Sequence, residues 1–500
     1  MKIIITVLWF LIFTKLLLFW LWLWQLKEYR LDRFLAHFET QGLRKIISSF
    51  WRWKFPQFTK KIIAIFFTCL AAETFLFYFI TSYFWGSDGL KGIEWVVVFF
   101  WAIILTIFFI PLILLFFQIP TFIWRKIIIN KAALKLEKFK DLLVIGITGS
   151  YGKTSTKEFL TTILSSKFKV FSTPSHQNTD IAIAQLILKK ITQDVEIFIV
   201  EMAAYKRGEI TSPCRIVKPK IGILTAINEQ HLATYGSLEN IVKTKYELIE
   251  SLPENGLAIF NGDNDYCYQL YKMTQKKKRI YSFQSSIAGL PADLHITSLA
   301  VNRDFLSFKI VDKEGKSAVF KVNLLGDYNV SNILAAACCA KELGMNLEEI
   351  ALASQKIESW QSGIQFKKGI NGLNIIDATY SANPDGVISH LEYLKIWPGK
   401  KVIVMPCLIE LGKASKRIHK EIGKKIGEVC DLSIVTTQER FQEIGEGATE
   451  KGMKGKDVLF TDNPKEIFEK IRSFCQSGDV VLLESRVPDQ LIKQLTKVFI

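Results

Sequence analysis

The sequence predicts an α/β protein in which N-terminal transmembrane helices precede two α/β domains. Three observations support this prediction. Long apolar segments are concentrated in the first quarter of the 500-residue chain. A glycine-containing loop between a strand pattern and a helix pattern follows them. From roughly residue 363, short apolar runs alternate with helical stretches, which is typical of a smaller Rossmann-like domain.

Residues 1–123 form the predicted transmembrane region. Three segments in it are long enough to cross a bilayer as helices: residues 3–24, 62–84 and 93–118. The first segment is too long for a signal peptide, and no small-residue cleavage site follows it. Lys15 and Glu73 lie within predicted spans, where pairing, a functional role, or simple packing and snorkelling all stay open.

The distribution of basic residues predicts the orientation, because short Lys- and Arg-rich loops remain cytoplasmic. Residues 25–61 contain nine Lys or Arg and three acids, whereas the loop 86–92 is nearly neutral. We therefore expect a multi-pass protein of the inner cell membrane with its N-terminus outside and its large C-terminal part in the cytoplasm. Residues 124–140 are expected to form a basic juxtamembrane linker, either as an amphipathic helix on the membrane surface or as a solvated stretch.

The charge distribution and the cysteine pattern argue against a nucleic-acid-binding, zinc-binding or disulfide-rich protein. The net charge of +16 could indicate a nucleic-acid partner, but much of the excess flanks the apolar segments and no nucleic-acid-binding motif is present. The eight cysteines form no C-x-x-C pair, so neither a zinc site nor a disulfide framework is predicted.

A phosphate-binding loop is predicted at the start of the soluble part. Residues 141–147 have the pattern of a buried strand, TGSYGKT follows at 148–154, and a helical pattern runs over 155–166. In this geometry glycines let the backbone approach phosphates, a lysine reaches the outer phosphates, and a hydroxyl binds Mg²⁺ at the helix N-terminus. The expected nucleotide contacts are Gly149, Ser150, Gly152, Lys153, Thr154 and Ser155. A standard Walker loop has a glycine at the position where this chain has Ile147.

A carboxylate is expected beside this loop. Glu201 ends an apolar run and so lies at the carboxyl end of a predicted strand, where it is a candidate Mg²⁺ ligand. A second apolar run, residues 221–227, leads similarly towards His231. A lone histidine is more often structural, and Lys245 by itself would be expected as an exposed charge.

Four further segments resemble the Mur ligases in their order and approximate spacing. These are Thr173 to Asp180 (TPSHQNTD), Glu201 to Ile210 (EMAAYKRGEI), Asn228 to Lys245 (NEQHLATYGSLENIVKTK) and Gly326 to Asn332 (GDYNVSN). Residues 252–265 and 376–385 are most similar to the members that add D-alanyl-D-alanine to a UDP-linked muropeptide. The resemblance covers about residues 141–500 and implies a P-loop-type central ligase domain at 141–361 and a C-terminal Rossmann-like ligase domain at 362–500.

The resemblance also implies roles for individual residues. Thr154 and Glu201 would hold one Mg²⁺, and His231 and a carbamylated Lys245 would hold a second. Lys243 competes for the carbamylated position, but alignment of KYELIES with the family segment favours Lys245. Together with Lys153, the residues Glu201, His231 and Lys245 would form the catalytic set.

Nucleotide and substrate contacts follow from the same resemblance. Asn329 and Asn332 would contact the adenine side of ATP, with helix capping as the alternative for at least one of them, and Asp377 would contact the nucleotide. The expected substrate-binding residues are Asn178, Thr179, Asp180, Asn383 and Asp385.

The implied reaction is ATP-dependent amide formation through an acyl phosphate, in the synthesis of a cell-wall precursor. The partners would be a muropeptide, UDP-linked or lipid-linked, and an amino acid or dipeptide amine. Two alternatives stay open. One is an amide ligase of another polymer, such as a poly-γ-glutamate synthetase, and the other is a catalytically impaired nucleotide-binding membrane scaffold.

The chain departs from the family at several positions. It has Ile364 in place of an arginine, Ala378 in place of a second acid, Pro406-Cys407 in place of Gly-Asp, and Leu483-Glu484 in place of Lys-Gly. Membrane spans also occupy the place of the domain that holds the uridine nucleotide. This second departure favours a lipid-linked substrate, because an anchor raises the effective concentration of a substrate at the bilayer.

Overall fold

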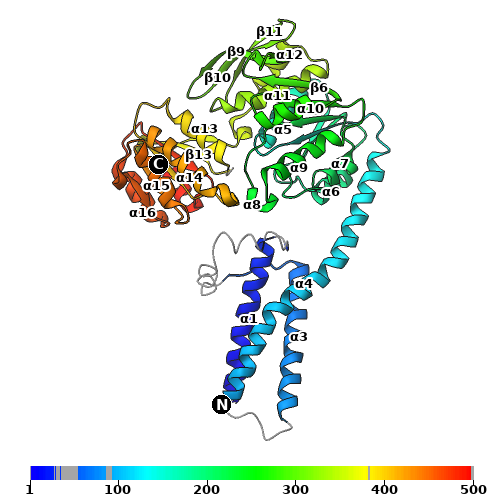
Figure 1. Cartoon of the computed structure of the whole chain (residues 1–500), viewed down its shortest axis with the longest axis vertical. Coiled ribbons are helices and arrows are strands. Elements are labelled where there is room, and N and C mark those ends of the chain that lie inside the picture. The colour runs from blue at the N-terminus through cyan, green and yellow to red at the C-terminus, as the bar shows by residue number, and fades with distance from the viewer. Residues whose placement is uncertain are drawn as a thin grey trace. The chain divides into compact units, whose positions relative to one another are not determined.

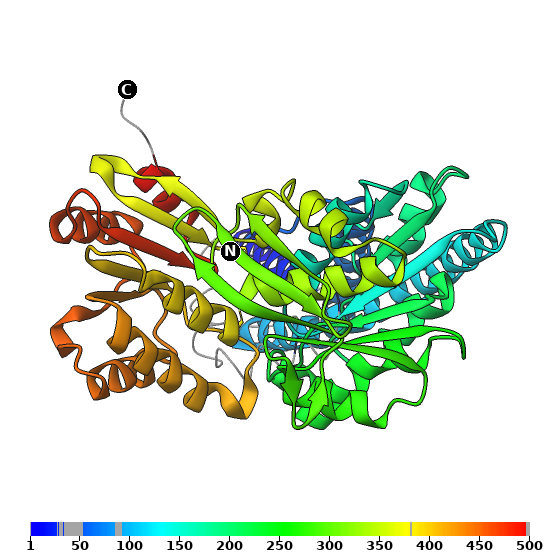
Figure 2. The same ribbon diagram turned by 90° about the horizontal axis from the view of Figure 1, so that it is seen from above.

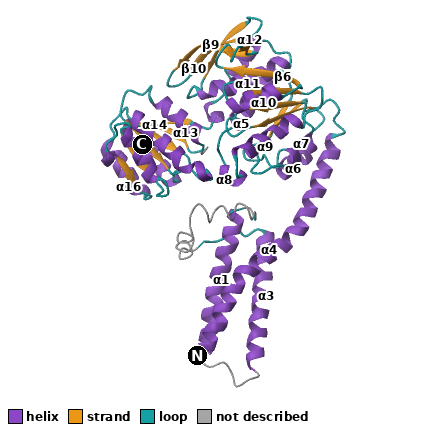
Figure 3. Cartoon of the chain, in the orientation of Figure 1, coloured by secondary structure: helices purple, strands orange, loops and turns teal. Residues whose placement is uncertain are grey.

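A computed structural model of the chain describes residues 2–27, 29, 34, 54–85, 93–380 and 383–496. The chain divides into two compact units, Met1–Ile127 and Ile128–Ile500. The described part of the first unit is helical, whereas the second unit mixes helices and strands (Figure 3). Each unit is considered by itself.

The first unit contains α1 (Lys2–Leu26), α3 (Lys60–Trp85) and most of α4 (Ile93–Leu136). The three predicted segments each fall within one of these helices (Figure 1). Their inner faces share a core that includes Leu17, Leu21, Ile62, Ile65 and Leu114.

Membrane crossing is less well supported than helix formation. Among the described residues, one helical stretch, residues 110–136, is both long and apolar enough to cross a bilayer, and 6% of its most apolar window is buried. A single such helix also occurs in soluble proteins, so the predicted multi-pass topology is not established. The predicted outside loop, 86–92, and most of the basic stretch 25–61 lie outside the described residues.

Helix α4 continues without interruption through most of the predicted linker at 124–140. In the second unit its last turns pack against the soluble domain, where Ala132 is fully buried and Leu136 contacts the same core. The Lys135 ammonium donates hydrogen bonds to the carbonyls of Ile187 and Leu188, at 2.8 and 3.1 Å. These carbonyls belong to the last turn of a helix, which a cation stabilises. The end of the basic stretch is therefore held by protein contacts.

The central domain is built on a nine-stranded sheet with the order β11-β10-β9-β6-β5-β4-β1-β3-β2. Its strands are β1 (Leu143–Thr148), β2 (Val170–Ser172), β3 (Ile197–Glu201), β4 (Ile221–Leu224), β5 (Leu257–Asn261), β6 (Lys277–Ser282), β9 (Leu294–Val301), β10 (Leu306–Asp312) and β11 (Ser317–Val322). A short hairpin, β7 (Ser286–Ile287) with β8 (Leu290–Pro291), lies apart from this sheet. Strands β2 to β6 and β1 run parallel, and β9, β10 and β11 form an antiparallel extension. The alternating apolar pattern of residues 293–325 is that of such strands.

Helices cover both faces of the parallel part, as a parallel sheet requires. The helices are α5 (Lys153–Leu164), α6 (Asp180–Lys190), α7 (Thr211–Val217), α8 (Leu232–Tyr235), α9 (Leu238–Glu250), α10 (Asp265–Met273), α11 (Tyr328–Glu342) and α12 (Leu347–Ser354). Helices α5, α11 and α12 share one core with the sheet, and α6, α7, α9 and α10 share the other. Successive residues of β1 alternate between these cores: Ile145 and Ile147 face the first, and Val144 faces the second.

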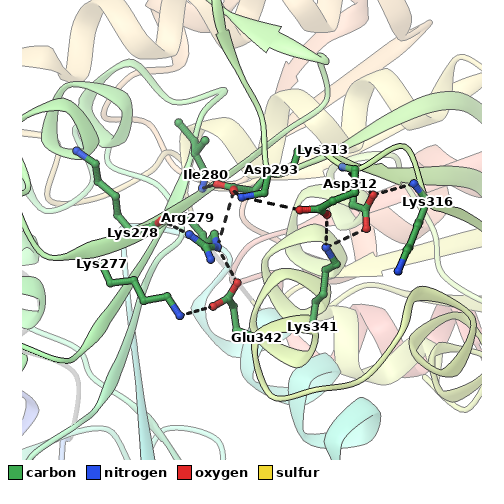
Figure 4. Close-up of polar contacts among 11 residues, drawn as sticks. Lys277, Lys278, Arg279, Ile280, Asp293, Asp312, Lys313, Lys316, Lys341 and Glu342 are labelled. Atoms are coloured by element: carbon green, nitrogen blue, oxygen red, sulfur yellow. Dashed lines mark hydrogen bonds and ion pairs between the residues drawn. The ribbon is translucent and has the colours of Figure 1, made fainter.

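A network of ion pairs joins the antiparallel extension to the end of α11 (Figure 4). Lys341 on α11 lies 2.9 Å from Asp312 on β10, and Arg279 on β6 lies 2.6 Å from Glu342. Burial alone would raise the pKa of Asp312, but hydrogen bonds from Lys341 and the Lys316 backbone outweigh it and lower that pKa. The network therefore adds ion pairs to an extension whose strands also share a buried core with α11 and α12.

The C-terminal domain has a six-stranded sheet with the order β12-β13-β17-β14-β15-β16, in which only β12 is antiparallel. The strands are β12 (Gln365–Lys368), β13 (Asn374–Ala378), β14 (Lys401–Met405), β15 (Leu432–Val435), β16 (Val458–Phe460) and β17 (Val480–Glu484). The helices are α13 (Pro384–Leu394), α14 (Ser415–Val429), α15 (Phe441–Glu450), α16 (Pro464–Phe474) and α17 (Asp489–Thr496). Helices α13 to α15 pack on one face and α16 and α17 on the other (Figure 2). The predicted Rossmann-like alternation is confirmed.

Candidate active site

The glycine loop connects β1 to α5, as predicted, and two of its positions require glycine. Gly149 has φ +156°, and a Cβ atom there would lie 2.1 Å from the Thr225 Oγ1. Gly152 has φ +78°, and a Cβ atom there would lie 2.5 Å from the Asn332 Oδ1. The loop therefore lies tightly against β4 and α11, with its end at the N-terminus of α5.

Lys153 begins α5 and folds back over the loop. Its ammonium donates to the carbonyls of Gly149 and Ser150, at 2.9 and 3.1 Å. Burial lowers the pKa of Lys153, although the nearby Glu201 carboxylate acts in the opposite direction. The Ser155 hydroxyl donates to the Ser362 carbonyl at 3.4 Å, and its contact with a nucleotide stays a prediction.

Glu201 is the last residue of β3, as predicted, and is 3% exposed. Its two carboxylate oxygens accept hydrogen bonds from the Thr154 hydroxyl at 3.0 Å and from the Asn178 amide at 2.9 Å. Three of the predicted site residues, from three different segments, therefore meet at the carboxyl end of the sheet. Lys157, which the sequence did not single out, is fully buried and lies 3.9 Å from the Glu201 carboxylate.

His231 and Lys245 complete the wall of the same pocket. The pocket is lined by Gly149, Ser150, Lys153, Thr154, Asn178, Glu201, Ala203, Ala204, Tyr205, Gln230, His231, Tyr235 and Lys245. Sequence reasoning missed Tyr205, Gln230 and Tyr235 as lining residues, although all three lie within the segments that it singled out.

Lys245 is 4% exposed, so the expectation of an exposed charge at this position is wrong. Burial, and then the neighbouring charge of Lys153, lower the pKa of Lys245 to about 7. The competing Lys243 is half exposed and pairs with Glu239 one helical turn away. The geometry therefore favours Lys245 for the site.

His231 occupies the position before α8 in a left-handed conformation, with φ +63°. Its Nδ1 lies 2.5 Å from the Glu410 carboxylate, and the Tyr205 ring lies edge-on to it with centroids 4.8 Å apart. Burial lowers the pKa of His231, whereas the hydrogen bond to the Glu410 carboxylate acts in the opposite direction, so burial favours the neutral ring.

The donor set at the pocket fits divalent cations bound together with a nucleotide. Within the described residues, no three His, Cys, Asp or Glu side chains are grouped closely enough to hold an ion by themselves. Mg²⁺ in nucleotide sites typically takes only one or two protein oxygens, with phosphates and waters completing its coordination. The Thr154 hydroxyl and the Glu201 carboxylate supply such a pair of oxygens.

The two predicted adenine-side asparagines lie at the start of α11, but neither caps the helix. Asn332 accepts a hydrogen bond from Thr156 at 3.3 Å and donates to Asn329 at 3.4 Å. Asn329 donates to the Leu325 carbonyl at 2.8 Å. Both side chains are buried, and Asn332 lies against the glycine loop and its helix, so capping does not explain them.

Five residues were predicted to bind the substrate, and one of them, Asn178, lines the pocket. Thr179 precedes α6 without a side-chain capping bond, and Asp180 accepts from Ser212 at 3.1 Å. Asn383 caps α13 by accepting from the Gly386 amide at 2.8 Å. Asp385 accepts from the Asn228 side chain at 2.7 Å, which links the two domains.

Asp377, the predicted nucleotide contact in the C-terminal domain, is the last residue but one of β13 and lies beside a cation that the sequence did not single out. The Lys367 ammonium lies 2.6 Å from its carboxylate. Burial would raise the pKa of Asp377, but the bonds from Lys367 and Thr379 outweigh it and lower that pKa. Lys367 stands three residues after Ile364, where the resemblance predicts an arginine, and Ile364 is fully buried in the core.

The chain matches two consecutive family profiles, the Mur ligase middle domain at residues 147–340 and the Mur ligase glutamate ligase domain at 364–486. Together these matches span more than half of the chain and contain the glycine loop, Glu201, His231 and Lys245. The protein belongs to the Mur ligase family, whose members are ATP-dependent ligases that form amide bonds.

Individual relatives and solved structures of this family are also similar to the chain. The UDP-N-acetylmuramoyl-tripeptide--D-alanyl-D-alanine ligase of Bacillus subtilis is 27% identical over 344 residues, covering 68% of this chain and 72% of that enzyme. The crystal structure of MurF from Thermotoga maritima in complex with ADP has a TM-score of 0.64 and 28% identity, covering 74% of this chain and 83% of that one. A MurF structure from Acinetobacter baumannii has a TM-score of 0.66 and 25% identity, covering 74% and 80%.

Proposed function

We propose that this chain is a membrane-anchored ligase of peptidoglycan-precursor synthesis that adds D-alanyl-D-alanine, or a related amine, to the peptide of a muropeptide. The observation that carries the proposal is the single pocket in which Lys153, Glu201, His231 and Lys245 converge beside the glycine loop. The names of the relatives supply the substrate class.

The proposed reaction has two steps. A peptide carboxylate attacks the γ-phosphorus of ATP and ADP leaves, which gives an acyl phosphate. The amine then attacks the acyl carbon, inorganic phosphate leaves, and the nitrogen loses a proton as the amide forms. Lys153, once released from the loop carbonyls, stabilises the charge on the transferring phosphoryl group.

Two Mg²⁺ ions would neutralise the phosphate charge when bound. Thr154 and Glu201 would hold one ion. His231 and Lys245 would hold the other, provided that Lys245 carries a carbamate. A lysine with a pKa of about 7 is partly neutral at physiological pH, and only the neutral amine reacts with CO₂. The buried position of Lys245 therefore suits this modification.

Membrane anchoring is proposed from the surface of the first unit. Its helices expose large apolar side chains such as Phe67, Phe75 and Phe116, which are 61%, 70% and 69% exposed. Such a surface is costly in water and stable in hydrocarbon. We infer a multi-pass inner-membrane protein with its catalytic domains in the cytoplasm, acting on a lipid-linked muropeptide.

The test is phosphate release by the detergent-purified full chain with ATP and Mg²⁺, across soluble and lipid-linked muropeptides and candidate amines, with Lys153→Ala as control. We expect release that requires both an acceptor and an amine, prefers the lipid-linked acceptor, and is lost in the variant. Equal turnover of soluble and lipid-linked acceptors would overturn the lipid preference. ATP binding without turnover on any pair would overturn the ligase and favour the scaffold, and turnover only with glutamate polymers would favour the poly-γ-glutamate alternative.

A further inference from the structure

One short segment of the central domain, residues 228–233, carries several contacts to the C-terminal domain. Asn228 donates to Asp385 at 2.7 Å, and the Ala233 amide donates to the Glu410 carbonyl at 3.1 Å. Between them, His231 Nδ1 lies 2.5 Å from a Glu410 carboxylate oxygen. The same segment thus provides both a wall of the pocket and part of the interface between the domains.

Both members of the His231–Glu410 pair have strained backbones. Their φ angles are +63° and +64°, in the left-handed region that residues with a Cβ atom rarely adopt. Such a conformation is unfavourable by itself and persists only where its surroundings hold it. Here the Ala233–Glu410 backbone bond holds both turns together, and Gly412 brings the C-terminal backbone close to Ala233.

The hydrogen bond also selects one form of the imidazole. When Nδ1 carries the proton and donates it to a carboxylate, the lone pair is on Nε2, which is then the nitrogen able to bind a cation. Carboxylates that accept from metal-binding histidines in this way fix the orientation of the ring and raise its basicity. His231 is 28% exposed and lines the same pocket as Lys245, so Nε2 is the ring nitrogen that remains to bind a cation there.

We propose that Glu410 is a positioning residue that orients His231 from the C-terminal domain, so that the second metal site is complete only when the two domains are in contact. The inference rests on the proposed function, because it requires a cation at His231. It explains why a residue 179 positions away in the sequence meets His231 at hydrogen-bond distance. Through this contact, assembly of the metal site depends on closure of the C-terminal domain.

The experiment measures Mn²⁺ binding by electron paramagnetic resonance on the full chain with a non-hydrolysable ATP analogue. The variants are Glu410→Ala, which removes the acceptor, and Glu410→Gln, which keeps a neutral acceptor. Glu443→Gln is the matched control, since Glu443 is a partly buried carboxylate of the same domain that pairs with Arg440. Thermal unfolding and analogue affinity report whether each variant is folded.

We expect the unsubstituted protein to bind two Mn²⁺. In Glu410→Ala the weaker-held Mn²⁺ should bind about 10–100-fold less tightly, while affinity for the analogue is unchanged. Glu410→Gln should recover part of this loss, and Glu443→Gln should bind like the unsubstituted protein. Unchanged binding of both ions in Glu410→Ala would overturn the positioning role of Glu410 and would leave the proposed function standing. Failure of the unsubstituted protein to bind a second ion would instead overturn the proposed metal set.

Discussion

Ala378 and Glu484 lie directly opposite each other on the neighbouring parallel strands β13 and β17. The resemblance to the Mur ligases predicts an acid at the first position and a glycine at the second, whereas this chain has its carboxylate at the second. Glu484 is 1% exposed and lies 2.6 Å from His390 Nδ1, and the Tyr328 ring lies edge-on to that histidine. The substituted carboxylate is therefore engaged in a buried pair of the C-terminal domain.

Glu484→Ala tests whether this departure is structural. Removing the carboxylate leaves the buried His390 Nδ1 without its hydrogen-bond partner, which typically costs about 1–3 kcal/mol. We expect a loss of this size in the free energy of unfolding, measured by urea denaturation, with kcat/KM at low temperature little changed. Glu484→Gln, which keeps an acceptor, should lose less. If stability were unchanged and turnover were abolished, Glu484 would have to act in the reaction itself.

The role of Gly152 in the glycine loop can be tested by comparing two glycine-to-alanine variants. In Gly152→Ala the new Cβ atom would lie 2.5 Å from the Asn332 Oδ1, and the residue would keep a φ of +78°. We expect the loop to shift and kcat/KM to fall on the order of 100-fold, because small misplacements at a phosphate site are costly. Gly208→Ala is the control: it has φ +84° but no atom within 4 Å of the new Cβ. An equal loss in both variants would mean that strain, and not the Asn332 contact, limits the loop.

Much of this site could be predicted because its signals are local. The strand, glycine loop and helix at 143–164 lie within one short stretch, and Glu201 lies at a strand end that its apolar run reveals. The burial of Lys245 could not be predicted, because it depends on which face of α9 turns toward a pocket built by residues far away in the sequence. The contact of Glu410 with His231 could not be predicted for the same reason, although Glu410-Leu411-Gly412 resembles the family pattern. The strands β12 and β16 were missed because they contain only four and three residues.

The lowered pKa of Lys245 predicts how the activity depends on pH and on CO₂. Because its pKa is lowered to about 7, the amine is mostly protonated below pH 7 and mostly neutral above it. Carbamylation requires the neutral form, so activity should rise as the pH increases through 7. We expect activity to fall in CO₂-depleted buffer and to recover on addition of bicarbonate, measured as phosphate release with a saturating acceptor. Lys243→Ala should respond to bicarbonate like the unsubstituted protein, and a Lys245→Ala variant that still responded would exclude this lysine.

The ion-pair network at the antiparallel extension predicts the acid sensitivity of the fold. The pKa of Asp312 is lowered in the folded protein, so its contribution to stability is present above the unfolded pKa and is lost as the pH falls through the folded pKa. Lys341→Met removes the cation 2.9 Å from Asp312 and should lower the free energy of unfolding at pH 7 by about 1.5–3 kcal/mol. The difference between the variant and the unsubstituted protein should shrink below about pH 4, where Asp312 becomes protonated in the unfolded chain. Urea unfolding at a series of pH values measures both effects.

Lys395→Met, which removes an exposed pair with Glu392 on α13, is the control and should change stability by less than about 1 kcal/mol. A constant difference at every pH would show that Lys341 stabilises the extension through packing of its side chain and not through its charge.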